Sequence, residues 1–354
     1  MKLSSSFKGK ILLQALLIGL FTGICIVLFK LSITSLFGFI QKFTLNKIWL
    51  LPFITAFGGL VSGFLVSKFA PETKGSGIPY VKAALMHLGN LTRIRSIFVK
   101  FFGGIASIGC GMSLGREGPS VQLGAGVGAF IGKIFKLNGA DKDKLISAGA
   151  GSAIAATFNA PIAGCIFVLE ELMQKFNSSI LFPVLISTVI ASNVARSFFG
   201  NNTSFLIPKI NEDIALNLIP CLVVGVLSGI LGVIFSKLIH INNSIFSKIK
   251  IKPYLKPMFA GFLVGLIGIF LPLVMGSGNN SVDILLQGKI PFLIILLIFV
   301  FKFLITPVCF GSGAVGGIFL PMLMLGSYLG YIVGVFSNHF GVEIDLIAIS
   351  LIGM

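Results

Sequence analysis

The chain has 354 residues, of which 55% are apolar and only 11% are charged, and its formal net charge is +16. A soluble domain carries about 25% charged residues, so this composition excludes an ordinary soluble protein and predicts a polytopic membrane protein. The Lys and Arg residues lie mostly in short connections between apolar runs. There they orient helices and meet anionic lipid headgroups, so we expect the lipid bilayer as a partner and no nucleic acid.

The N-terminal residues 1–10 carry lysines and are followed by an apolar run from Ile11 to Ile40. That run is too long for the core of a signal peptide, and positive charge is typical of the cytoplasmic side. We therefore expect residues 1–10 to be a cytoplasmic N-terminal segment. The protein is predicted to be integral and multi-pass, in the plasma (inner) membrane.

Further apolar segments follow along the whole chain. They lie at 49–70, 94–112, 119–136, 145–173, 179–199, 214–241, 255–275, 290–310, 317–337 and 344–354. A helix perpendicular to the bilayer needs about 20 apolar residues, so the longer segments predict tilted helices. Others are interrupted by Gly and Pro, and non-helical backbone at membrane depth survives only inside protein or beside a wet cavity. We therefore expect an all-α protein with broken, tilted helices around an interior pathway.

The sequence also repeats itself. One constant shift aligns three pairs of residues: Lys100 with Lys302, Gly115 with Gly317, and Pro119 with Pro321. A slightly different shift aligns Gly75-Ser76-Gly77 with Gly276-Ser277-Gly278. Paired broken helices in two halves are typical of an inverted-repeat transporter whose site lies between the halves. We expect a first membrane repeat at 11–210 and a second at 211–354.

The second repeat stops earlier than the first. In the first copy, Gly151 is followed by a predicted helical stretch that runs from Ser152 to Met173, whereas the second copy reaches Gly353 and stops at Met354. We therefore expect the second repeat to be incomplete at its C-terminal end, either because the chain is a fragment or because it is naturally truncated.

The motif Gly115-Arg116-Glu117-Gly118-Pro119 lies inside a long apolar run. A charged side chain at the bilayer centre costs roughly 2.5–3.5 kcal/mol, so such residues usually mark a pathway or site. The glycines break the helix and Pro119 suits the first turn of a new one, which leaves N–H groups and a positive dipole end free. The pattern predicts an anion site that the Glu117 carboxylate can occupy. The alternative is a buried Arg116–Glu117 ion pair at a glycine kink.

Two more segments place glycine before proline inside apolar sequence. They are Gly75-Ser76-Gly77-Ile78-Pro79 and Gly316-Gly317-Ile318-Phe319-Leu320-Pro321. We expect all three motifs to converge on one anion, which backbone N–H groups and the Ser76 hydroxyl would hold by partial charges alone. Taken singly, the first could be a loop turn and the second a patch of helix-packing glycines.

Together these motifs resemble the signature of the CLC family of chloride channels and chloride/proton antiporters. The stretch from Phe158-Asn159-Ala160-Pro161 to Glu170-Glu171 is similar to the family as well, and the likeness runs from about Ile11 to Met354. The resemblance implies an all-α inverted-repeat fold. It also implies a homodimer with one pathway per subunit, provided that the helices absent from this sequence, which supply part of the interface, are present.

The resemblance further implies roles for individual residues. Ser76, with Gly77 beside it, resembles the chloride-coordinating segment, and Ile318 and Phe319 resemble the residues whose backbone N–H groups bind the central chloride. Glu117 resembles the gating glutamate, and Glu171 resembles the inner proton-transfer glutamate of antiporter members. The supporting motif residues are Gly75, Ile78, Pro79, Gly115, Arg116, Gly118, Pro119, Gly316, Gly317 and Pro321. None of the tyrosines occupies the position from which the family's tyrosine reaches the chloride.

The predicted function is therefore exchange of chloride for protons. Desolvation favours a neutral Glu117 while N–H dipoles favour its anion, so this side chain can change charge during transport and compete with chloride. Chloride is expected as bound substrate, with no cofactor. The alternatives are a chloride channel without proton coupling, in which Glu171 would be a solvated helix end, and an inactive truncated family member. An enzyme is not expected, because His87, His240 and His339 are scattered, the cysteines are solitary and no metal-ligand spacing occurs.

Overall fold

The computed structural model describes residues 5–174, 178–201, 205, 218–288 and 290–354. The helices of the first half are α1 (Ser5–Thr44), α2 (Leu51–Phe69), α3 (Ile78–Leu85), α4 (Ile94–Gly109), α5 (Glu117–Ile134), α6 (Gly139–Phe158), α7 (Pro161–Phe167) and α8 (Ser178–Phe199). Those of the second half are α9 (Leu218–Lys248), α10 (Leu255–Phe270), α11 (Asn279–Leu286), α12 (Phe292–Ser312), α13 (Phe319–His339) and α14 (Leu346–Gly353). Short 3-10 turns lie at Ile48–Leu50, Pro71–Thr73 and Pro272–Val274, and a π-helical turn at Val168–Met173.

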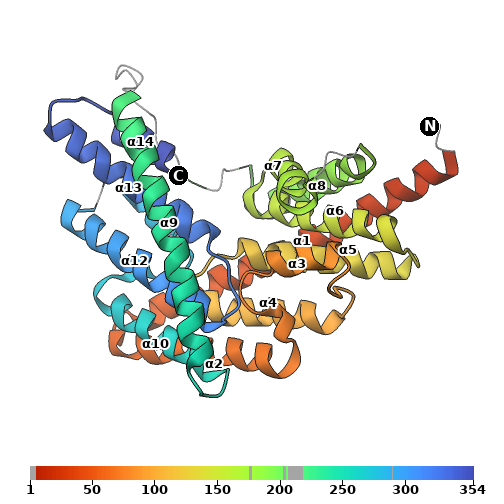
Figure 1. Ribbon diagram of the computed structural model, residues 1–354, viewed down its shortest axis with the longest axis horizontal. Coiled ribbons are helices and arrows are strands. Elements are labelled where there is room, and N and C mark those ends of the chain that lie inside the picture. The colour runs from red at the N-terminus through yellow and green to blue at the C-terminus, as the bar shows by residue number, and fades with distance from the viewer. Residues whose placement is uncertain (1–4, 175–177, 202–204, 206–217, 289) are drawn as a thin grey trace.

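This architecture confirms the predicted all-α membrane fold. Within the described ranges, 6 helices are long and apolar enough to cross a bilayer. Others, such as α3 and α11, have only 8 residues and cannot span alone. Figure 1 shows α9, α12, α13 and α14 gathered on one side and α5–α8 on the other. Helix α2 of the first half packs against α10 of the second, so the two halves are in direct contact.

Some predicted boundaries differ from the observed ones. The run 145–173, predicted as one continuous segment, is not one helix: α6 ends at Phe158, and Asn159 takes a left-handed conformation with φ 58°. Pro161 then starts α7, because proline lacks the N–H that a continuing helix would need. Helix α1 begins at Ser5, inside the predicted segment 1–10, and the predicted boundary at 210/211 lies outside the described residues.

The internal repeat is visible in the backbone. Gly75 and Gly77 have φ of 65° and 92°, and their partners Gly276 and Gly278 have φ of 64° and 100°. Glycine populates these left-handed conformations at little cost, which is why both loops use it. The pairing of these two loops, inferred from sequence, is confirmed.

A buried lysine of α4 ties down the first loop, and a buried lysine of α12 ties down the second. Lys100 Nζ donates to the carbonyls of Thr73 (2.9 Å) and Gly75 (2.7 Å). Lys302 Nζ donates to the carbonyls of Val274 (2.8 Å) and Gly276 (2.7 Å). Both side chains are fully buried, so each ammonium replaces its lost water by backbone oxygens.

Glycines set how closely the helices cross. A Cβ atom on Gly124 of α5 would lie 2.2 Å from the carbonyl oxygen of Gly149 in α6, and one on Gly149 would lie 2.0 Å from that of Gly124. Small residues allow such backbone-to-backbone contact, which is the usual basis of helix association in membranes. The α5–α6 contact in turn fixes where the start of α5, with Glu117, lies in the molecule.

Candidate functional site

Backbone hydrogen bonds bring the three glycine-proline motifs together. Gly75 N–H donates to Ala314 (3.2 Å), and Gly316 N–H donates back to Gly75 (3.1 Å). Gly115 and Gly317 exchange two hydrogen bonds of 2.7 Å. The segment 314–317 is therefore held between the other two motifs, and the starts of α3, α5 and α13 meet at one point.

Ser76 lies directly against the start of α5. A Cβ atom on Gly118 would lie 2.2 Å from Ser76 Oγ and 3.0 Å from Ser76 Cα. One on Gly77 would lie 2.2 Å from Gln122 Oε1. The absence of side chains at Gly118 and Gly77 is what lets the predicted chloride-binding serine approach the Glu117 helix.

Glu117 is the first residue of α5 and its side chain is buried, with 1% exposed. The backbone N–H groups of Glu117, Leu320 and Arg116 face its carboxylate. Neither carboxylate oxygen makes a hydrogen bond of regular geometry with the part of the chain that the structure describes. The carboxylate thus lies among the positive ends of α5 and α13, the kind of position that binds anions at helix N-termini.

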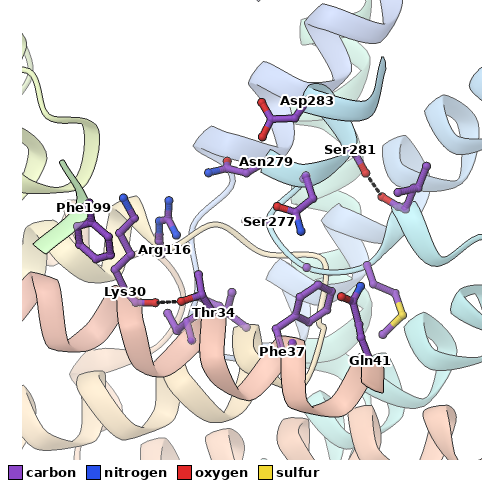
Figure 2. Close-up of a pocket in the computed structure, with 18 of the residues that line it drawn as sticks. Lys30, Thr34, Phe37, Gln41, Arg116, Phe199, Ser277, Asn279, Ser281 and Asp283 are labelled. Atoms are coloured by element: carbon purple, nitrogen blue, oxygen red, sulfur yellow. Dashed lines mark hydrogen bonds between the residues drawn. The ribbon is translucent and has the colours of Figure 1, made fainter. Parts of the chain in front are cut away.

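Arg116 turns away from its neighbour. The salt bridges among described residues do not include an Arg116–Glu117 pair. Instead the Arg116 side chain lines a cavity beside Lys30 (Figure 2). The two charges still interact, but among the described residues they do not form the close salt bridge that the alternative interpretation of the motif requires.

Ile318 and Phe319 stand where the sequence predicted, at the start of α13. Ile318 is the N-cap residue and its carbonyl accepts from Met322 N–H at 2.9 Å. The Phe319 ring meets the Phe158 ring edge to face, with the centroids 5.8 Å apart. The fourth sequence motif, which begins at Phe158, thus contacts the third motif at the same meeting point.

Glu171 lies apart from this cluster, in the π-helical turn Val168–Met173. Its carboxylate forms a salt bridge with Lys82 of α3, at 2.7 Å between Nζ and Oε1. The side chains of Glu171 and Lys82 are 49% and 27% exposed, so the pair lies at the surface of the chain. Because α3 begins beside Ser76 and carries Lys82 in its second turn, this short helix connects the anion motifs to Glu171.

Sequence reasoning missed the roles of several lysines. Lys100 and Lys302 were used only as markers of the repeat, and Lys30 and Lys82 were not singled out. A signal was present, because a lysine inside an apolar run is costly and usually has a specific partner. Lys30 and Lys100 both stand in such runs. Among the described residues, no group of three His, Cys, Asp or Glu side chains could hold a metal ion.

The sequence profile of a known family, described as voltage gated chloride channel, matches residues 58–354. The chain belongs to this family. The resemblance seen in the motifs is thereby confirmed, and so is the CLC-type fold expected from it. Every motif singled out above lies within the matched region.

Relatives in this voltage-gated chloride channel family carry transporter names. A protein of Vibrio cholerae named H(+)/Cl(-) exchange transporter ClcA is 37% identical over 84% of this chain and 66% of its own length. A protein of the same name from Yersinia pestis is 36% identical over 86% of this chain and 66% of its own. The chain thus spans 66% of the length of these two relatives.

Solved structures agree with the fold. A slow cyanobacterial Cl-/H+ antiporter is 28% identical, with a TM-score of 0.89 over 97% of this chain and 84% of the other. A CLC-type fluoride/proton antiporter is 26% identical, with a TM-score of 0.81 over 98% and 86%. The second neighbour shows that one fold serves antiporters of different halides.

Proposed function

We propose that this chain exchanges chloride for protons across the membrane, with Glu117 competing against chloride for one site. The observation that carries the proposal is the position of the Glu117 carboxylate among the backbone N–H groups at the starts of α5 and α13. The names of its relatives and of the cyanobacterial neighbour support the same reaction.

The anion site uses partial charges only. Ser76 Oγ and the backbone N–H groups at Ile318 and Phe319 are the proposed chloride ligands, with Gly77 fixing the turn that presents Ser76. Donors without a full charge hold chloride weakly enough to release it, which transport requires. The close approach of Ser76 to Gly118 supports this arrangement, since it brings the hydroxyl next to the helix that begins with Glu117.

The carboxyl group of Glu117 links the two ions. When it is ionised, it fills the place among the N–H groups; when it accepts a proton, that place becomes free for chloride. Glu171 is the proposed inner proton-transfer group, and its position at the surface of the chain supports that role. Competition for a single place couples the two fluxes without a large movement of domains.

The test is proton movement in liposomes that contain the full chain, driven only by a chloride gradient. We expect proton uptake against its own gradient, and loss of this uptake with retained chloride flux in Glu117→Gln. Glu171→Gln should likewise lose proton coupling, whereas Glu170→Gln, the neighbouring carboxylate, should keep it. Coupled proton uptake that persists in Glu117→Gln would refute the mechanism, and flux of neither ion would refute the proposed activity.

One observation favours a second candidate, a chloride channel without proton coupling. Glu171 is engaged by Lys82, so accepting a proton requires that an ion pair be broken. If this pair holds, chloride would pass while protons would not. In the same liposomes, chloride flux without any proton movement would identify this candidate.

The orientation in the membrane and the assembly are proposed on separate grounds. We propose that the protein lies in the plasma (inner) membrane with its N-terminus in the cytoplasm, which the lysines of residues 1–10 support. We propose a homodimer as the assembly, on the family resemblance alone. The orientation can be tested by protease accessibility of an N-terminal tag in sealed vesicles of both orientations. The homodimer can be tested by cross-linking in the bilayer.

A further inference from the structure

The end of α2 and the connection from α9 to α10 form a lysine-rich corner of the chain. Its four exposed lysines, which we call the lysine corner, are Lys68 in the last turn of α2, Lys248 at the end of α9, and Lys250 and Lys252 in the connection. A Cβ atom on Gly63 of α2 would lie 2.9 Å from the Cα atom of Tyr254, so the connection packs closely on α2. Figure 1 shows the end of α9 turning into α10 at the lower edge of the molecule, beside α2.

Aromatic rings lie beside two of these ammonium groups. Lys68 Nζ lies 5.2 Å from the centroid of the Phe64 ring and 5.6 Å from that of Phe69. Lys252 Nζ lies 6.0 Å from the Tyr254 centroid. The Phe64 and Tyr254 rings meet edge to face, with their centroids 6.2 Å apart, so one pair of rings connects the two lysines. Contact with a ring face steadies an ammonium group and still leaves N–H donors for an anion.

The lysine corner carries more positive charge than its surroundings balance. Among the described residues, no salt bridge includes any of its four lysines. The nearest acid in sequence is Glu72, whose carboxylate accepts a hydrogen bond from Ser96 Oγ of α4, and Lys74 beside it balances its charge. Lys256 is a further cation, but it points inward and donates to the carbonyl of Phe246. The corner therefore remains strongly positive when these groups are counted.

Exposed apolar side chains share this surface. Ile249 and Ile251 alternate with the lysines from residue 248 to residue 252, and both are exposed, as are the rings of Phe64 and Phe69. Lys68 also lies at the end of the candidate membrane span Ile48–Phe69, at the level where lipid headgroups are expected. A soluble anion has no use for exposed isoleucines, whereas the boundary between headgroups and acyl chains accommodates both kinds of side chain.

We propose that the lysine corner binds the headgroup phosphate of an anionic phospholipid. The phosphate would lie between Lys68 and Lys252, and the acyl chains would lie along Ile249 and Ile251. Helices α1 and α2 are both long enough to cross the bilayer, so the corner lies on the same side as the N-terminal end of α1. The cytoplasm is proposed for that side, and the cytoplasmic leaflet is the one whose surface is negative.

The test is native mass spectrometry of the full chain in detergent, titrated with dioleoyl phosphatidylglycerol and, separately, with dioleoyl phosphatidylcholine. We expect the chain to bind the anionic lipid more tightly. A lysine near an anionic headgroup contributes about fivefold in affinity, so Lys68→Gln/Lys252→Gln should weaken phosphatidylglycerol binding roughly 25-fold. The matched control is Lys42→Gln/Lys47→Gln, which removes two exposed lysines at the opposite end of the α2 span and should leave binding unchanged.

A second variant, Lys68→Arg/Lys252→Arg, keeps both charges and should retain phosphatidylglycerol binding. The proposal would be overturned if the Arg pair lost as much binding as the Gln pair, or if the two lipids bound equally. Equal losses in the two Gln pairs would also overturn it, because they would show only a general attraction to a cationic protein. Displacement of the lipid by glycerophosphate would assign the corner to a soluble phosphate instead. Because binding is measured without transport, the result is independent of the proposed exchange activity.

Discussion

Lys82 is the residue whose partner bears most directly on proton transfer. Its ammonium lies 2.7 Å from the Glu171 carboxylate, and both side chains are partly exposed at the surface of the chain. Ion pairs in such settings contribute only about 0–1 kcal/mol to stability, so the pair is not needed to hold the fold. Its effect should instead be kinetic, because Glu171 must leave the ammonium before it can accept a proton.

We therefore expect Lys82→Gln to speed proton exchange, and to raise the proton-to-chloride ratio if proton transfer limits coupling, while leaving thermal stability unchanged. The measurement is the proton-to-chloride flux ratio in liposomes, with the unfolding temperature in detergent alongside. Lys144→Gln is the control, because Lys144 forms a comparable exposed pair with Asp141 at 2.7 Å, within α6. Slower proton exchange in Lys82→Gln would show that the lysine assists the transfer.

At the scale of elements, the crossing of α5 and α6 determines where Glu117 lies. Gly124 and Gly149 bring the two backbones into contact, and each faces the carbonyl of the other. A carbonyl in the backbone of a packed helix cannot move aside as a flexible side chain can. Even a single added methyl group must therefore push the helices apart.

Gly149→Ala should consequently destabilise the protein by about 1–3 kcal/mol, the usual cost of overpacking. Gly225→Ala in α9 is the matched control, since a Cβ atom there would meet nothing within 4 Å. That control should be neutral or more stable by up to about 1 kcal/mol, because alanine favours helix over glycine. Thermal unfolding followed by size-exclusion chromatography in detergent compares the two; equal losses would mean that the α5–α6 contact is not tightly packed.

At the scale of the whole molecule, both halves contain a buried lysine bound to a glycine loop, but the two loops lie at different sites. Lys100 and Lys302 each bind the carbonyls of a glycine loop, but only the first loop contains a residue proposed to bind chloride, Ser76. The second loop lines the cavity beside Arg116. A repeated fold thus carries an anion site in one copy and part of a separate cavity in the other.

This difference predicts unequal effects of equal substitutions. Lys100→Met and Lys302→Met should both lower stability, by about 1–3 kcal/mol for each carbonyl left unsatisfied. Chloride flux per folded molecule should fall strongly in Lys100→Met and little in Lys302→Met. Flux in liposomes, normalised to correctly folded protein, separates the two effects, and a similar loss in both variants would contradict the assignment of the site to the first loop.

Much of this protein follows from local sequence. Low charge and long apolar runs specify a helical membrane protein, because bilayer depth tolerates little else. Glycine followed by proline specifies where helices break and restart, because glycine accepts a left-handed backbone and proline suits a first helical turn. For that reason the three motifs, the pairing of Gly75 with Gly276 and a new helix with Pro119 in its first turn could all be predicted.

Only the tertiary structure decided which distant groups meet. No local pattern specified four contacts: the lack of a direct Arg116–Glu117 salt bridge, the pairing of Lys82 with Glu171, the lysines that hold the two loops, and the cavity lined by Lys30 and Arg116. Such contacts depend on the angle and depth at which helices cross, which many weak packing interactions set together. The local sequence therefore determines what each residue can do chemically, whereas the packing of the whole fold determines which residue it contacts.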